Sequence, residues 1–108
     1  LGGVAGHAGL FTTAEDLARF CRMFPPGTTP ATAAPLKAST LALMTAVQSP
    51  SGQPRRGLGW DIDSPYSGIR GSIFPIGGFG HTGWTGPSLW IDPFSGTFLV
   101  FMSNRNHP

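Results

Sequence analysis

The last strand that the sequence predicts, at residues 97–103, is apolar on both of its faces. Its centre reads Phe98-Leu99-Val100-Phe101-Met102. Because side chains alternate between the two faces of a sheet, such a strand needs cover on both sides. Helices usually supply that cover, and the sequence offers only two convincing ones. We therefore expect an α+β fold, an antiparallel sheet with flanking helices, in a chain that is incomplete or needs a partner to cover it.

The first helix is predicted at residues 14–24, with Thr13 as its cap and the proline pair at 25–26 as its end. Its apolar side chains recur at the i, i+3, i+4 and i+7 spacing of one helix face. They are Leu17, Phe20, Cys21 and Phe24. Cys21 is the only cysteine, so no internal disulfide is possible, and its place on this stripe predicts a buried thiol.

A second, shorter helix is predicted at residues 39–47, with Ser39 as its cap. Its inward side chains are expected to be Leu43, Met44 and Val47. Turn-forming residues predict loops at 25–35 and 48–56. Arg55 and Arg56, in the second of these loops, are expected to be solvated. Nucleic acid is not an expected partner, because nucleic-acid-binding surfaces cluster many more basic residues on one face.

Strands are predicted at residues 57–62, 79–83, 88–92 and 97–103, with a long irregular stretch at 63–78. In the first strand, Leu58, Trp60 and Ile62 are expected to share one face. Pro93-Phe94-Ser95-Gly96 predicts a hairpin with the glycine in the left-handed conformation. All three tryptophans are expected in the core, and they are Trp60, Trp84 and Trp90.

The richest segment chemically is Phe79-Gly80-His81-Thr82-Gly83-Trp84-Thr85-Gly86. It places His81 and Thr82 on a strand edge, and a lone histidine near aromatic residues is more often structural. Gly78, Gly80 and Gly83 match the dinucleotide fingerprint formally, but that motif needs a helix to begin at the third glycine. A strand follows here, so no dinucleotide or other cofactor is expected. Asp61 and Asp63 are interpreted as a strand-end and turn pair, and the three histidines give no metal signature.

Three stretches, in this order, resemble one enzyme family: the glycine-rich run and helix start at 2–20, Gly57-Leu58-Gly59-Trp60-Asp61, and residues 79–93. They resemble the β-lactamase-related serine hydrolases, which include class C β-lactamases, penicillin-binding D-alanyl-D-alanine carboxypeptidases and related esterases. The resemblance runs to Asn104-Arg105 and implies a partial β-lactamase/transpeptidase-like fold, with residues 1–108 as its C-terminal part. It places the turn around His7 near the cleft, although His7 itself is expected to pack or bond among the glycines.

The resemblance implies catalysis through an acyl-enzyme. The family uses a Ser-x-x-Lys nucleophile, a Tyr-x-Asn motif, and a Lys-Thr-Gly or His-Thr-Gly motif on a strand beside the cleft. By this resemblance His81 would take the basic position, Thr82 would bind a substrate carboxylate, and Gly83 would leave room for the acyl chain. The backbone N–H of Trp84 would be one of two oxyanion-hole donors. A histidine in place of lysine favours esterase or peptidase activity over a β-lactamase.

Two of the family's motifs do not occur in this sequence. The single lysine, Lys37, stands three residues after Ala34, and the single tyrosine, Tyr66, is followed by Ser67-Gly68. We therefore expect a serine-hydrolase segment that contributes the His-Thr-Gly side of the cleft and is inactive alone. Its expected partners are the missing N-terminal portion of the same fold and, in the complete protein, a small-molecule or peptide substrate.

Two other hypotheses remain at this stage. The chain could be a non-catalytic binding or accessory module of the same fold that exposes Trp84 to a ligand, or a truncated reading frame without function. No apolar run reaches the roughly 18 residues needed to span a bilayer, so no membrane segment is expected.

Overall fold

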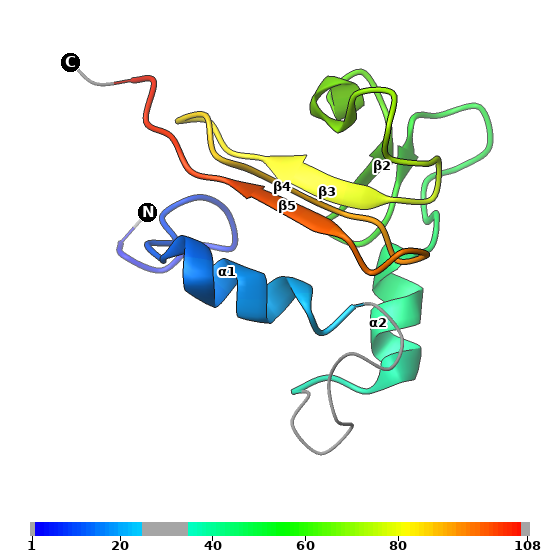
Figure 1. Ribbon diagram of the computed structural model, residues 1–108, viewed down its shortest axis with the longest axis horizontal. Coiled ribbons are helices and arrows are strands. Elements are labelled where there is room, and N and C mark those ends of the chain that lie inside the picture. Colours follow the sequence, from blue (N-terminus) through cyan, green and yellow to red (C-terminus); the bar gives the residue numbers. More distant parts are fainter. Residues whose placement is uncertain (1, 25–34, 107–108) are drawn as a thin grey trace.

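The computed structural model describes residues 2–24 and 35–106. They contain helices α1 (Ala14–Cys21) and α2 (Ala38–Thr45) and a short 3-10 helix, η1 (Ser67–Arg70). The strands are β1 (Arg55–Arg56), β2 (Asp61–Asp63), β3 (Phe79–Thr82), β4 (Ser88–Ile91) and β5 (Phe98–Phe101). All five strands form one antiparallel sheet in the order β1-β2-β3-β4-β5 (Figure 1). The predicted α+β fold is therefore confirmed.

Helix α1 lies along one face of the sheet, next to β5 (Figure 1). Its start follows the sequence prediction, because the Thr13 hydroxyl oxygen accepts a hydrogen bond from the Asp16 N–H at 3.1 Å. The helix ends at Cys21 rather than at residue 24. A turn continues it, in which the Phe24 N–H donates to the Cys21 carbonyl at 3.2 Å, so Phe24 still reaches the sheet.

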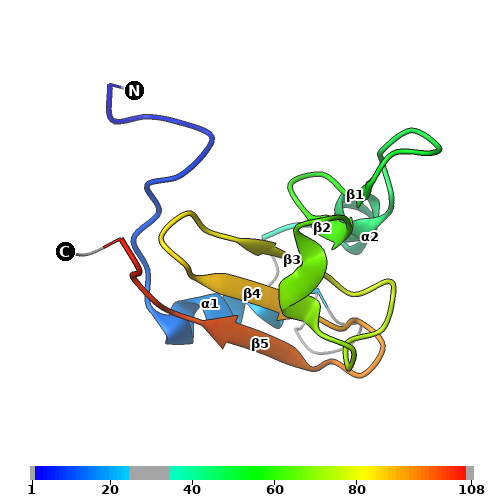
Figure 2. The same ribbon diagram turned by 90° about the horizontal axis from the view of Figure 1, so that it is seen from above.

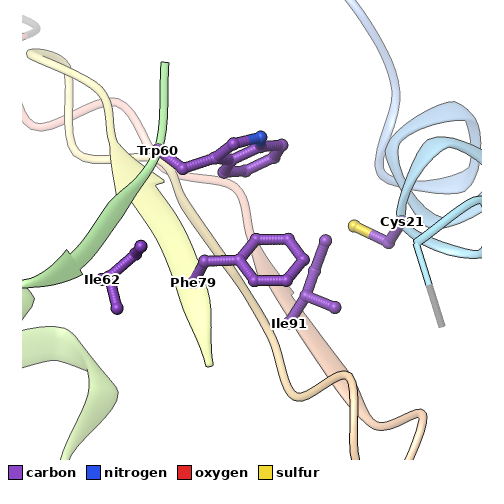
Figure 3. Close-up of a cluster of buried hydrophobic side chains, with 5 residues drawn as sticks. All are labelled: Cys21, Trp60, Ile62, Phe79 and Ile91. Atoms are coloured by element: carbon purple, nitrogen blue, oxygen red, sulfur yellow. The ribbon is translucent and has the colours of Figure 1, made fainter. Parts of the chain in front are cut away.

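The core lies between α1 and the sheet, and Figure 3 shows its five buried side chains. They are Cys21, Trp60, Ile62, Phe79 and Ile91. Aromatic rings join the helix to the sheet: the Phe24 ring lies edge-on to Trp60 at 5.1 Å and to Phe79 at 5.4 Å between centroids. Edge-to-face pairs at this separation are favourable beyond the area that they bury. The predicted burial of Cys21 and Trp60 is confirmed.

Strand β5 is covered on one face only, within the described residues. Phe98 and Val100 pack against the core, whereas Leu99 and Phe101, on the opposite face, are 46% and 55% exposed. The expectation of an apolar strand covered on both sides is thus met on the α1 side alone. The other face presents Leu99 and Phe101 to solvent.

The predicted strand at 57–62 is wrong for residues 57–60, because the strand β2 begins at Asp61. Residues 57–60 form a tight turn, closed by a 2.9 Å hydrogen bond from the Gly57 N–H to the Trp60 carbonyl. Gly59 adopts a φ of +76°, which bends the chain back and leaves Leu58 half exposed. As a consequence, residues 55–56, predicted as a loop, pair with β2 as strand β1.

Helix α2 also differs from its prediction. Lys37 occupies the cap position without a side-chain hydrogen bond, and Ser39 lies inside the helix. Leu41 is the buried side chain, while Leu43 and Val47 are 56% and 50% exposed. The helix is apolar on several faces, so its periodicity does not select the side that faces the protein.

The hairpin between β4 and β5 forms as predicted. Gly96 has a φ of +73°, and its N–H donates to the Asp92 carbonyl at 3.0 Å. The Asp92 carboxylate accepts hydrogen bonds from the Phe94 N–H at 2.9 Å and the Ser95 hydroxyl at 2.6 Å. These bonds hold the pKa of Asp92 below its usual value, chiefly through Ser95 and against the opposing effect of burial.

The remaining loop predictions have mixed outcomes. The irregular stretch at 63–78 contains η1, and the predicted loop at 25–35 falls, apart from Pro35, outside the described residues. Neither helix in the described part of the chain is long and apolar enough to cross a bilayer.

Candidate active site

The candidate site is built on the edge of β3. Strand β4 pairs with β3 along its whole length, from Phe79 to Thr82, but β2 pairs with it only at Gly80, opposite Asp61. Within the described residues, the β2-facing edge of β3 is therefore open from His81 onward. Unpaired N–H and C=O groups on a strand edge can accept an extended chain as an additional strand. His81 and Thr82, predicted to lie on a strand edge, do lie there.

His81 is exposed and has two hydrogen-bond partners. Its Nδ1 lies 2.6 Å from the carbonyl oxygen of Thr82, and its Nε2 lies 3.2 Å from Nη2 of Arg56. The Arg56 side chain reaches His81 from β1, which is two strands away in the sheet. The imidazole is thus held at the strand edge by a contact between residues 25 positions apart in the sequence.

Gly83 and Trp84 begin the loop that joins β3 to β4. The Gly83 N–H donates to the Pro87 carbonyl at 2.7 Å, and the Gly86 N–H donates to the Gly83 carbonyl at 3.0 Å, so the loop is a tight turn. Trp84 is 83% exposed, which contradicts its predicted place in the core. It lies beyond the last paired residue of β3, where no described element covers the indole. In the described part of the chain, the Trp84 N–H has no hydrogen-bond acceptor.

Three segments lie at this end of the sheet. Figures 1 and 2 place the N-terminal segment, the β3–β4 loop and the C-terminal segment at the same end of the molecule. Arg105 joins two of them, because its backbone N–H donates to the Thr85 carbonyl at 2.8 Å and its Nε donates to the Trp84 carbonyl at 3.3 Å. The glycine-rich run at the N-terminus therefore lies on the same side as the candidate site.

His7 does not pack among the glycines as predicted. It is exposed on a loop whose residues 3 and 5–10 surround a hollow open to solvent, and its side chain has no hydrogen bond within the described residues. Four glycines in residues 2–9 leave few side chains that could cover an imidazole.

The two aspartates of β2 take different environments. Asp63 forms an ion pair with Arg70 at 3.2 Å, which fits its interpretation as a turn residue. Asp61 is buried, and its Oδ1 has no hydrogen-bond partner. No group of three or more histidine, cysteine or carboxylate side chains that could hold a metal ion occurs in the part of the chain that is described.

Arg56 is the residue of this site that the sequence predictions missed. It was interpreted as one half of a solvated pair, yet it contacts the histidine of the His-Thr-Gly motif. The Gly57-Leu58-Gly59 run was a usable signal, because a tight turn there folds the preceding residue back beside β2.

Comparison with known proteins points to one family. The family model described as Beta-lactamase matches residues 1–108. A protein of Escherichia coli (strain K12) named "Putative D-alanyl-D-alanine carboxypeptidase" is 32% identical over 109 residues, which are 99% of this chain and 25% of that protein. A protein of the same name from Salmonella paratyphi B is 34% identical over 112 residues, with the same coverage. The chain thus spans about a quarter of the length of these relatives.

A solved structure agrees with the sequence comparisons. A β-lactamase from Mycobacterium bovis superposes with a TM-score of 0.64 and 28% sequence identity, over 90% of this chain and 38% of that one. The match along the whole sequence and the shared antiparallel fold lead to one conclusion: the chain belongs to the β-lactamase family.

Proposed function

We propose that this chain forms the His-Thr-Gly side of the active-site cleft of a serine hydrolase, and that the substrate is a peptide ending in D-alanyl-D-alanine. The observation that carries the proposal is the open edge of β3 from His81 onward. An extended peptide can pair with that edge and so bring its scissile carbonyl beside the β3–β4 loop. The relatives named as carboxypeptidases support the choice of peptide over β-lactam.

The proposed reaction follows the acyl-enzyme route. A serine hydroxyl, supplied by residues that this sequence does not contain, attacks the carbonyl between the two D-alanines. The C–N bond breaks, the terminal D-alanine leaves with a proton, and water then cleaves the serine ester. In this chain, the Trp84 N–H, which has no acceptor within the described residues, would donate to the carbonyl oxygen as it becomes negative. The Thr82 hydroxyl would bind the substrate carboxylate, and Gly83 would leave space for the acyl chain.

A chimera tests the proposal directly. This 108-residue chain replaces the matching quarter of the Escherichia coli relative, and release of D-alanine from a peptide ending in D-Ala-D-Ala is measured. We expect hydrolysis that falls roughly 100-fold or more in His81→Ala, because the groups that the imidazole positions beside the reacting carbonyl are displaced. Thr82→Val should raise KM, whereas Thr82→Ser, which keeps the hydroxyl, should not. A folded chimera that releases no D-alanine would refute the substrate and the reaction.

One observation favours a second candidate, a non-catalytic binding module. Trp84 is 83% exposed at the tip of a tight turn, where an indole is free to stack on a ligand. For such a module, Trp84→Ala would abolish ligand binding while the chimera remains without hydrolytic activity. In the hydrolase, the same substitution keeps the backbone N–H and should leave most of the activity intact.

A further inference from the structure

Two contacts of the His81 ring indicate which of its nitrogens carries hydrogen. A guanidinium group can only donate hydrogen bonds, so Nε2 of His81 must accept the one from Arg56 at 3.2 Å. A carbonyl oxygen can only accept, so Nδ1 must carry the hydrogen that is shared with Thr82 at 2.6 Å. Both conditions hold together only in the neutral tautomer with hydrogen on Nδ1. In that tautomer the ring accepts from Arg56 and donates to Thr82.

Arg56 brings a positive charge, and nothing in the described residues neutralises it. The described ion pairs join Arg19 to Glu15 and Asp16, and Arg70 to Asp63. Arg56 stands beside Asp61 in the β1–β2 register, yet it forms no ion pair with that carboxylate. The guanidinium has five N–H donors, and one of them contacts Nε2 of His81. Its other donors remain for an anion.

We propose that Arg56 is a second basic residue of the His-Thr-Gly site: His81 holds it in place, and its guanidinium binds the carboxylate of the substrate. An arginine side chain is always charged, so Arg56 brings a permanent positive charge beside His81. The planar guanidinium also matches a carboxylate with two parallel hydrogen bonds, which an ammonium group cannot do. The identity of the substrate, a peptide with a free C-terminal carboxylate, rests on the proposed function.

The first test reads the histidine directly and needs no activity. Nitrogen-15 NMR spectra of the 108-residue chain, at about pH 8 where free histidine is neutral, distinguish a protonated from an unprotonated ring nitrogen. We expect a protonated Nδ1 and an accepting Nε2 at His81, and a change of the Nε2 shift in Arg56→Met. Arg55→Met, at the exposed neighbour on the same strand, should leave the shift unchanged, and exposed His7 is the internal reference. The same spectra of the chimera provide the second measurement.

The second test measures carboxylate binding. N-acetyl-D-alanine and its amide are titrated into the chimera and its variants, and binding is followed by NMR shifts. Arg56→Met should weaken binding of the carboxylate roughly 10- to 100-fold, the range for a hydrogen bond to a charged group, and change amide binding less than about twofold. Arg56→Lys should restore part of the affinity, because lysine keeps the positive charge but lacks the planar guanidinium that makes two parallel hydrogen bonds.

The outcomes separate this proposal from the one before it. A protonated Nε2 in the unmodified chain, or equal loss of carboxylate and amide binding in Arg56→Met, would overturn the role of Arg56. If both tests succeed while the chimera hydrolyses no peptide, Arg56 stands as a carboxylate-binding residue and the hydrolase proposal fails. If the chimera is active and Arg56→Met leaves its KM unchanged, the hydrolase proposal stands and the role of Arg56 fails.

Discussion

Replacing Gly80 with alanine should destabilise the sheet by about 3 kcal/mol, the upper end of the usual cost of overpacking a core. A Cβ at this position would overlap the carbonyl oxygen of Leu89 and lie 2.6 Å from Cδ2 of Trp90. Neither group can yield easily, because the first belongs to the backbone of β4 and the second to a side chain that is 1% exposed. The gain of alanine over glycine in a strand, at most about 1 kcal/mol, does not offset this.

Gly68→Ala is the matched control. Its Cβ would have no heavy atom within 4 Å, and its φ lies outside the left-handed region. We expect a change within about 0.5 kcal/mol, as for ordinary surface substitutions. The host is the 108-residue chain, and the chimera serves as a second host.

The assay is urea unfolding followed by the fluorescence of buried Trp60 and Trp90. Thermal unfolding gives a second reading, because a loss of about 3 kcal/mol corresponds to a fall in Tm of roughly 12–24 °C for a domain of this size. If Gly80→Ala unfolds within 1 kcal/mol of the unmodified chain, the close packing of Trp90 over Gly80 is wrong.

Three further predictions follow from local contacts. Burial raises the pKa of the Cys21 thiol to about 11, so alkylation at about pH 8 should be roughly 100-fold slower in the folded chain than in urea; equal rates would mean that the thiol is accessible. The lowered pKa of Asp92 stabilises the fold above the unfolded value of 3.8, and this is lost as the pH falls through the native pKa. The stability difference between the unmodified chain and Asp92→Asn, measured by urea midpoints, should therefore vanish in acid; a difference that persists there would contradict the assignment to the carboxylate. Thr13→Ala should lower the free energy of unfolding by about 1 kcal/mol, because the hydrogen bond to the Asp16 N–H is lost, whereas Thr13→Ser should be nearly neutral.

The elements that the sequence predicted well are those that local chemistry decides. Strands β3, β4 and β5 lie within the predicted ranges, because short apolar runs and the glycine and proline turns that bound them act over a few positions. The start of α1 is equally local, since Thr13 caps it regardless of what lies beyond.

The errors arise where distant parts of the chain decide the outcome. The buried face of α2 depends on what it packs against, and an apolar sequence on several faces does not encode that choice. Strand β1 exists only because a tight turn brings Arg56 beside Asp61. The glycine turn at 57–59 predicts the place of Arg56 beside β2, but the contact between Arg56 and His81 spans 25 positions, and the turn does not predict it.

The central claim is that this chain supplies the His-Thr-Gly side of a cleft whose nucleophile lies in other residues. The intact mass of the purified 108-residue chain and of the chimera, measured after incubation with benzylpenicillin or a fluorophosphonate probe, tests it most directly. The account predicts a covalent adduct on the chimera and none on the chain. An adduct on the chain would place a nucleophile within these 108 residues and would contradict the account.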